Sequence, residues 1–172
     1  NYGDFMLKKR GSGVLMHISS MPSPYGVGVF DENVLHFIDK ICDMSFGYWQ
    51  VLPLNPTDGA NSPYCSVSAF AGDYIYINPQ GLCDMGLISE DDVKANIYDK
   101  TPYTADYEFA RKARLQTLKK AFLNVGSNLA QEIKEFEISN SWLTDYAVFM
   151  AVKELENGRP WWEWSDEHAH YY

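Results

Sequence analysis

Hydrophobic positions in the first half of the chain follow the pattern of a strand, a helix and a second strand. Residues 13–19 (GVLMHIS) and 48–54 (YWQVLPL) are short, almost continuous apolar runs that end at turn-forming residues, which predicts strands covered on both faces of a parallel sheet. Residues 32–46 repeat apolar side chains at helical spacing and end before Gly47. Strand, helix and parallel strand make a βαβ unit, so the pattern indicates the start of an α/β barrel or a doubly wound sheet. Residues 73–77 (DYIYI) indicate a further short strand or extended segment.

After about Leu87 the pattern becomes helical. Ser89 and Asp92 have the spacing of a capping box, which predicts a helix that begins after Ser89. Longer helices are predicted over residues 107–125, 128–137 and 141–157, the last ended by glycine and proline. We therefore expect two parts, residues 1–86 with the βαβ unit and residues 87–172 with mainly helices.

The loop after the second predicted strand holds the best candidates for ligand binding. Ligands of parallel α/β proteins bind at the C-terminal ends of the strands. There, Asn61 and Ser62 offer an amide and a hydroxyl, Pro63 stiffens the backbone, and Tyr64 offers a flat ring that can stack on a sugar. The alternative for Tyr64 is packing on its own domain, and Asn61 and Ser62 are also ordinary turn formers.

Other polar residues near the strand ends are weaker candidates. His17 lies in the middle of the first predicted strand, where a buried histidine with a satisfied hydrogen bond is favoured over a substrate contact. Asp58 and Asp73 lie on expected mouth loops, where turn roles are favoured. Three residues after the first strand either line a cleft or only form turns: Ser19, Ser20 and Tyr25.

Composition and charge exclude several classes of function. A chain of 172 residues, 46% hydrophobic and 15% aromatic, has enough apolar surface for a core. Its net charge of −9 disfavours nucleic acid and anionic membrane surfaces as partners. No apolar run approaches the roughly 20 residues of a membrane span, and no signal peptide is evident. Three widely spaced cysteines, Cys42, Cys65 and Cys83, indicate a reducing compartment, so we expect a cytoplasmic protein.

Four sequence blocks, in the same order and register, resemble the N-terminal portion of 4-α-glucanotransferases, the amylomaltases or disproportionating enzymes. They are residues 12–28 (SGVLMHISSMPSPYGVG), 49–57 (WQVLPLNPT), 62–72 (SPYCSVSAFAG) and 142–164 (WLTDYAVFMAVK, then PWWEW). The resemblance implies a (β/α)₈ TIM-type barrel with a mainly helical insertion. Such a barrel needs about 250 residues, so it is incomplete in this chain. Residues 1–86 would be the first βαβ part with substrate-cleft loops, and residues 87–172 the insertion, itself truncated.

The resemblance also implies an activity. The family moves α-1,4-glucan segments between maltooligosaccharides by double displacement with retention and needs no cofactor or metal for catalysis. The tyrosine that matches Tyr64 stacks on the donor sugar beside the cleaved bond. Three positions depart from the family. Gly59 stands where many members have a tyrosine of a secondary glucan-binding groove, Cys65 stands where glutamine usually follows Ser-Pro-Tyr, and Val29 stands where aspartate follows the Gly-Ile-Gly of the family.

No catalytic residue is assigned within the chain. Retaining transfer needs two carboxyl groups about 5–5.5 Å apart. A helix N-terminus explains Asp91 and Asp92, and a solvated turn explains Glu163 and Asp166. His168 and His170, one residue apart, are a weak metal signal, and no metal site is assigned.

The catalytic carboxylates are implied downstream, so the expected partners are α-1,4-glucans and the remainder of the barrel, as the same or another chain. Two alternatives stay open at this point. One is a non-catalytic module that binds α-glucan, and the other is an α/β domain whose resemblance is structural only.

Overall fold

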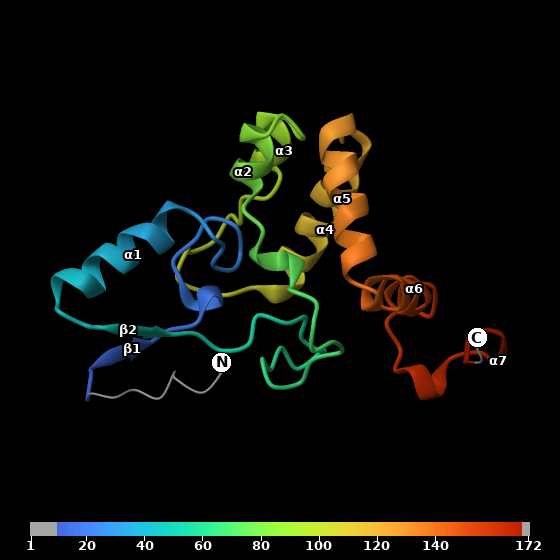
Figure 1. Ribbon diagram of the computed structural model, residues 1–172, viewed down its shortest axis with the longest axis horizontal. Coiled ribbons are helices and arrows are strands. Elements are labelled where there is room, and N and C mark those ends of the chain that lie inside the picture. The colour runs from blue at the N-terminus through green and yellow to red at the C-terminus, as the bar shows by residue number, and fades with distance from the viewer. Residues whose placement is uncertain (1–9, 170–172) are drawn as a thin grey trace. The chain divides into compact units, whose positions relative to one another are not determined.

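Strands β1 (Gly13–Leu15) and β2 (Tyr48–Gln50) pair in parallel, with Gly13 opposite Tyr48, in the computed structural model, which describes residues 10–169. Helix α1 (Glu32–Asp43) connects them, so the predicted βαβ unit is confirmed (Figure 1). The α1 helix begins where the Asp31 carboxylate accepts a hydrogen bond from the Asn33 amide, 2.9 Å away. Its Phe37 ring meets the Trp49 ring of β2 edge to face, with the centroids 5.2 Å apart.

Both strands are shorter than predicted. The chain leaves β1 after Leu15 and forms the 3₁₀ turn η1 (Ile18–Ser20), and beyond Gln50 the segment continues as extended loop. Because the chain turns into η1 after Leu15, the second run has no β1 partner beyond Gln50. Within the described residues the flanking positions of each strand are exposed, so coverage on both faces stays a prediction for a complete barrel.

The core of this part lies between η1, the loop behind it and helix α4 (Tyr107–Leu123). The segment that we expected to be a strand or extended, residues 73–77, is instead the 3₁₀ turn η2 (Tyr74–Tyr76). Asp73 causes this turn, because its Oδ1 atom accepts a hydrogen bond from the Ile75 amide, 3.2 Å away. The central core cluster consists of Ile18, Val27, Ile75, Tyr76 and Ala110.

Gly28 allows the loop after β1 to fold against η1. Its amide donates to the Ser19 carbonyl over 3.3 Å, and a Cβ atom at this position would lie 1.9 Å from the Ile18 carbonyl oxygen. Because no side chain fits in that space, glycine is required there.

Helices α2 (Pro79–Asp84) and α3 (Glu90–Lys94) precede α4, and α2 packs against both α3 and α4. The capping box of Ser89 and Asp92 is confirmed: the Ser89 hydroxyl accepts from the Asp92 amide, and the Asp92 carboxylate accepts from the Ser89 amide. Helix α2 was not predicted, although Asn78 caps it and Pro79 occupies its first turn.

The buried face of α4 differs from the apolar stripe in its sequence, since Phe122 is 71% exposed. Arg114 is fully buried on that face, where it donates to the Asn96 side chain over 2.7 Å and lies 5.6 Å from the centre of the Tyr25 ring. Burial lowers the pKa of Arg114 to about 10. The buried positions of the helix are Ala110, Arg114, Thr117 and Ala121.

The chain divides into two compact units between Val125 and Gly126. The second unit contains α5 (Ser127–Ser139), α6 (Trp142–Leu155), the 3₁₀ turn η3 (Trp161–Glu163) and the short helix α7 (Asp166–Ala169). The predicted helices at 128–137 and 141–157 therefore exist with slightly different ends. The functional division at residues 86 and 87 concerns the architecture of a complete enzyme and stays a prediction. No helix within residues 10–169 has the length and apolar character needed to cross a membrane.

Candidate functional site

The loop after β2 is closed at its base by backbone hydrogen bonding. The Asp73 amide donates to the Leu54 carbonyl over 2.7 Å, and the Asn55 side chain donates to the Ala71 carbonyl over 2.9 Å. The two ends of this loop, residues 54 and 73, therefore lie together. It follows the C-terminal end of β2, the end at which parallel α/β proteins bind ligands.

Within this loop, residues 57–66 form a small hairpin. Thr57 and Ser66 pair as an antiparallel bridge, and the Asp58 amide donates to the Cys65 carbonyl over 3.1 Å. At the tip, the Cys65 amide donates to the Ser62 carbonyl over 3.0 Å, so Pro63 and Tyr64 occupy the two central positions of a turn. The Tyr64 side chain is 74% exposed. Within the described residues its ring is thus presented to solvent at the tip, and packing against the rest of a barrel stays the alternative.

Asn61 and Ser62 lie beside Tyr64 and shape the same turn. Asn61 has a positive φ of 54°, a conformation that asparagine tolerates better than most residues. Its amide donates to the Asp58 carbonyl over 3.1 Å, and the Asp58 carboxylate accepts from the Ala60 amide over 3.0 Å. Asp58 thus has the turn role that the sequence favours, whereas the side chains of Asn61 and Ser62 remain half-buried next to the tyrosine.

The contacts of His17 lie in the core, outside this loop. His17 is buried, and its Nε2 atom lies 2.9 Å from the Tyr76 hydroxyl, while Nδ1 has no hydrogen-bond partner among the described residues. Burial lowers the pKa of His17, which favours the neutral imidazole. His17 is therefore a buried core histidine, and a role in substrate binding stays a prediction.

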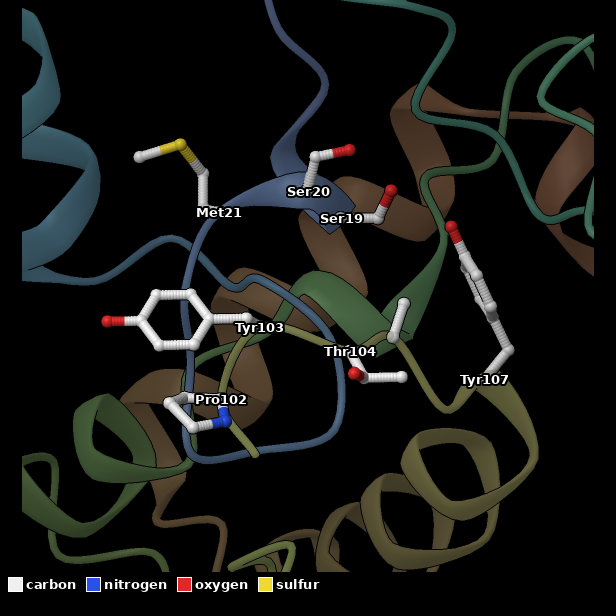
Figure 2. Close-up of a pocket in the computed structure, with 8 residues that line it drawn as sticks. Ser19, Ser20, Met21, Pro102, Tyr103, Thr104 and Tyr107 are labelled. Atoms are coloured by element: carbon white, nitrogen blue, oxygen red, sulfur yellow. The ribbon is translucent and has the colours of Figure 1, made fainter. Parts of the chain in front are cut away.

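A second candidate region lies where η1 faces the segment before α4. A cavity of about 190 Å³ is lined there mainly by hydroxyl-bearing and aromatic residues, shown in Figure 2. Ser19 and Ser20 line it as predicted, and the Ser19 and Tyr107 hydroxyls point toward the same side. Tyr25, the third residue expected on this loop, is buried beside Arg114 and does not line the cavity.

Sequence reasoning missed Tyr103, which lines this cavity and is 82% exposed. The sequence around Tyr103 could have indicated it, because Pro102-Tyr103 is flanked by threonines much as Pro63-Tyr64 is preceded by serine. Both tyrosines follow a proline that restricts the backbone and so hold a ring out to solvent.

Several acidic residues of the described chain have structural partners. Asp73, fully buried, forms an ion pair with Arg111 over 3.2 Å in addition to capping η2. Asp91 pairs with Lys94, and Asp92 pairs with Lys120 while it caps α3. Hydrogen bonds from Lys120 and Ser89 lower the pKa of Asp92 to about 2. None of these arrangements is a nucleophile and acid facing each other across a cleft.

The weak metal signal at the C-terminal end has a different explanation. The Nδ1 atom of His168 lies 2.6 Å from the Glu156 carboxylate, and His170 lies outside the described residues. Across the part of the chain that the structure describes, no three His, Cys, Asp or Glu side chains gather in a way that would hold a metal ion.

This fold is that of a known class of α/β carbohydrate-active enzyme. The chain superimposes on amylomaltase from Streptococcus agalactiae, solved in complex with acarbose, with a TM-score of 0.86 and 36% sequence identity over 92% of this chain and 32% of that one. It is 41% identical to the 4-alpha-glucanotransferase of Aquifex aeolicus over 92% of this chain and 32% of that protein. It is 36% identical to the 4-alpha-glucanotransferase of Thermus thermophilus over 90% of this chain and 31% of that protein.

The family profile described as 4-alpha-glucanotransferase matches residues 16–172, and the chain belongs to that family. It spans about a third of the length of the curated relatives that it matches. The resemblance seen in the four sequence blocks is therefore confirmed.

Proposed function

We propose that this chain is the N-terminal portion of a 4-α-glucanotransferase that transfers α-1,4-glucan segments between maltooligosaccharides by double displacement with retention. The observation that carries the proposal is family membership over residues 16–172, together with a tyrosine held in the open at the tip of the loop after β2. In this proposal β1, α1 and β2 begin a (β/α)₈ barrel, the helices after residue 86 belong to an insertion, and the remainder of the barrel supplies the catalytic carboxylates.

The chain itself would contribute a wall of the substrate cleft. Tyr64 has the exposure that stacking on the apolar face of a sugar requires, and the turn with Pro63 fixes its direction. Ser62 and Asn61 lie where a hydroxyl and an amide can bond to sugar hydroxyls. His17 would act indirectly, by supporting η1, which carries Ser19 and Ser20.

α-1,4-Glucans and maltooligosaccharides are the proposed ligands. The acidic net charge of −9 disfavours nucleic acid and anionic lipid but places no restriction on a neutral oligosaccharide. A cytoplasmic location, expected from the three cysteines, stays part of the proposal.

The test compares two proteins with maltotriose as the substrate. The complete enzyme that contains this chain is expected to produce glucose and longer maltooligosaccharides, with or without a metal chelator. Purified residues 1–172 are expected to produce neither, because no glycosyl-enzyme forms without a carboxylate nucleophile. Transfer by residues 1–172 in proportion to protein, above a mock preparation from the same host, would contradict the proposal.

The same comparison separates the proposal from the non-catalytic alternative. A binding module would hold maltoheptaose without transfer in the complete protein too. Binding is measured by calorimetry in parallel with product analysis, so a complete protein that binds but never transfers would favour the module.

A further inference from the structure

The guanidinium of Arg111 joins the start of the hairpin that carries Tyr64 to the end of the same loop. Arg111 lies near the start of α4, and its Nη2 atom donates to the Thr57 hydroxyl over 2.6 Å. The same nitrogen lies 3.2 Å from Oδ2 of Asp73. Thr57 is the first residue of the hairpin, and Asp73 is the residue at which the loop returns to its base.

The burial of Asp73 fixes the guanidinium in place. The Asp73 side chain is completely buried, whereas that of Arg111 is 26% exposed. A buried carboxylate is costly unless it is paired and hydrogen-bonded, so Asp73 requires this cation. The other arm of the planar guanidinium, Nη1, donates to Oδ1 of Asp73 over 3.4 Å. With that arm held by the carboxylate, the fixed geometry directs Nη2 at Thr57.

The hydrogen bond from Arg111 to Thr57 also constrains the tip of the hairpin. Thr57 pairs with Ser66, the next residues pair through the Asp58 amide and the Cys65 carbonyl, and the turn from Ser62 to Cys65 follows directly. A displacement of Thr57 would therefore shift the turn that presents Tyr64. A ring that stacks on a reacting sugar is sensitive to such shifts, since misplacement of about 1 Å can cost two orders of magnitude in rate.

We propose that Arg111 is a positioning residue that sets the place of Tyr64 in the substrate cleft by fastening Thr57 to the buried Asp73. The inference rests on the proposed function and assigns a task to α4. The helix belongs to the part of the chain that we expect to be an insertion, yet it holds a loop of the barrel part in place.

Thr57→Val in the complete enzyme is the sharpest test, because it removes the acceptor of the Arg111 bond and keeps both the side-chain shape and the ion pair to Asp73. Hydrogen exchange of the Asp58, Asn61 and Cys65 amides is expected to become about tenfold faster, the change expected for the loss of one hydrogen bond to a charged group. The kcat/KM for maltotriose is expected to fall, and this loss should not add to that of Tyr64→Ala in the double variant, because both changes remove the same contact.

Two further variants separate positioning from general stability. Arg111→Met should speed the same amides more strongly, and it should also lower the melting temperature because it leaves Asp73 buried without its cation. Lys120→Met is the matched control, since it removes another α4 cation whose partner is Asp92, far along the chain from the loop. It should leave both the exchange of the loop amides and kcat/KM unchanged.

Unchanged loop exchange in Thr57→Val would overturn the proposal, and so would a loss of kcat/KM that is fully additive with Tyr64→Ala. If the complete wild-type enzyme transfers no glucan, the proposed function fails. Exchange of the loop amides then decides alone whether Arg111 holds the hairpin.

Discussion

The Tyr76 hydroxyl lies 2.9 Å from Nε2 of His17, and the two rings meet edge to face with their centroids 5.6 Å apart. Burial lowers the pKa of the histidine and raises the pKa of the tyrosine, so both partners are held neutral. The pair joins η2 to the residue that precedes η1, the turn that carries Ser19 and Ser20. A proton on His17 would place an uncompensated charge in this core.

The first prediction is that acid destabilises the fold through His17. Its folded pKa lies below the unfolded value near 6.5, so the unfolded chain binds more protons between these two values. Stability from this residue is therefore complete above pH 6.5 and is lost as the pH falls from there toward the folded pKa. Melting temperatures of the complete protein between pH 8 and pH 5 should show this decline.

His17→Gln should weaken that pH dependence while it lowers stability at all pH values. The matched control is His36→Gln, which changes an exposed histidine of α1. An unchanged pH profile in His17→Gln would show that other groups cause the acid sensitivity.

Local sequence signals predicted those parts of the fold that local interactions determine. The capping box at Ser89 and the helix from Tyr107 were predicted because side chains within one or two turns decide them. The apolar run of residues 73–77 predicts a short strand or extended segment, because such a run looks the same in a strand and in the 3₁₀ turn that the structure has at Tyr74. The hydrogen bond from the Asp73 side chain to the Ile75 amide decides between the two.

The candidate site was predictable only in part, for the same reason. The residue types at Pro63 and Tyr64 indicate a turn in this loop. The contact between Arg111 and Thr57 joins residues 54 positions apart, and nothing in the local pattern of either segment encodes it. Arg114 shows most clearly what local sequence cannot predict. A charged residue is expected on the surface, but Arg114 is buried, where it donates to the Asn96 side chain and lies over the Tyr25 ring.

A second prediction concerns Glu156, which holds the segment after η3 to the end of α6. Its carboxylate accepts hydrogen bonds from the Ser165 hydroxyl over 2.7 Å and from His168, and it pairs with Arg159. The Ser165 and His168 bonds lower the pKa of Glu156 to about 2. Because this is below the unfolded value, the stabilisation is present above about pH 4.5 and is lost as the pH falls toward 2.

Glu156→Gln should therefore expose the Ser165 amide, which donates to the carboxylate over 3.2 Å, to faster hydrogen exchange at neutral pH. Glu163→Gln makes the same change of charge at an exposed position and should leave that amide protected. Equal protection of Ser165 in both variants would contradict the assigned role of Glu156.

A third prediction follows from the open sheet. Leu15 is 58% exposed and Tyr48 is 48% exposed on strands that have only each other as partners among the described residues. Unpaired strand edges with apolar side chains promote association. Isolated residues 1–172 should dimerise, swap or aggregate in light scattering unless the rest of the barrel is supplied. A monodisperse monomer with cooperative thermal unfolding would instead show a self-sufficient domain.

The last prediction concerns Tyr64 in the complete enzyme. If its exposed ring stacks on the donor sugar, Tyr64→Ala should lose about 1–3 kcal/mol of transition-state stabilisation, roughly ten- to a hundredfold in kcat/KM. Tyr64→Phe should lose far less, because the ring face and not the hydroxyl makes the proposed contact. The comparison requires equal melting temperatures, since a tyrosine that only packs would lower stability instead. A Tyr64→Ala enzyme that transfers glucan with wild-type efficiency, or that loses activity only as it unfolds, would make Tyr64 a structural residue of the loop.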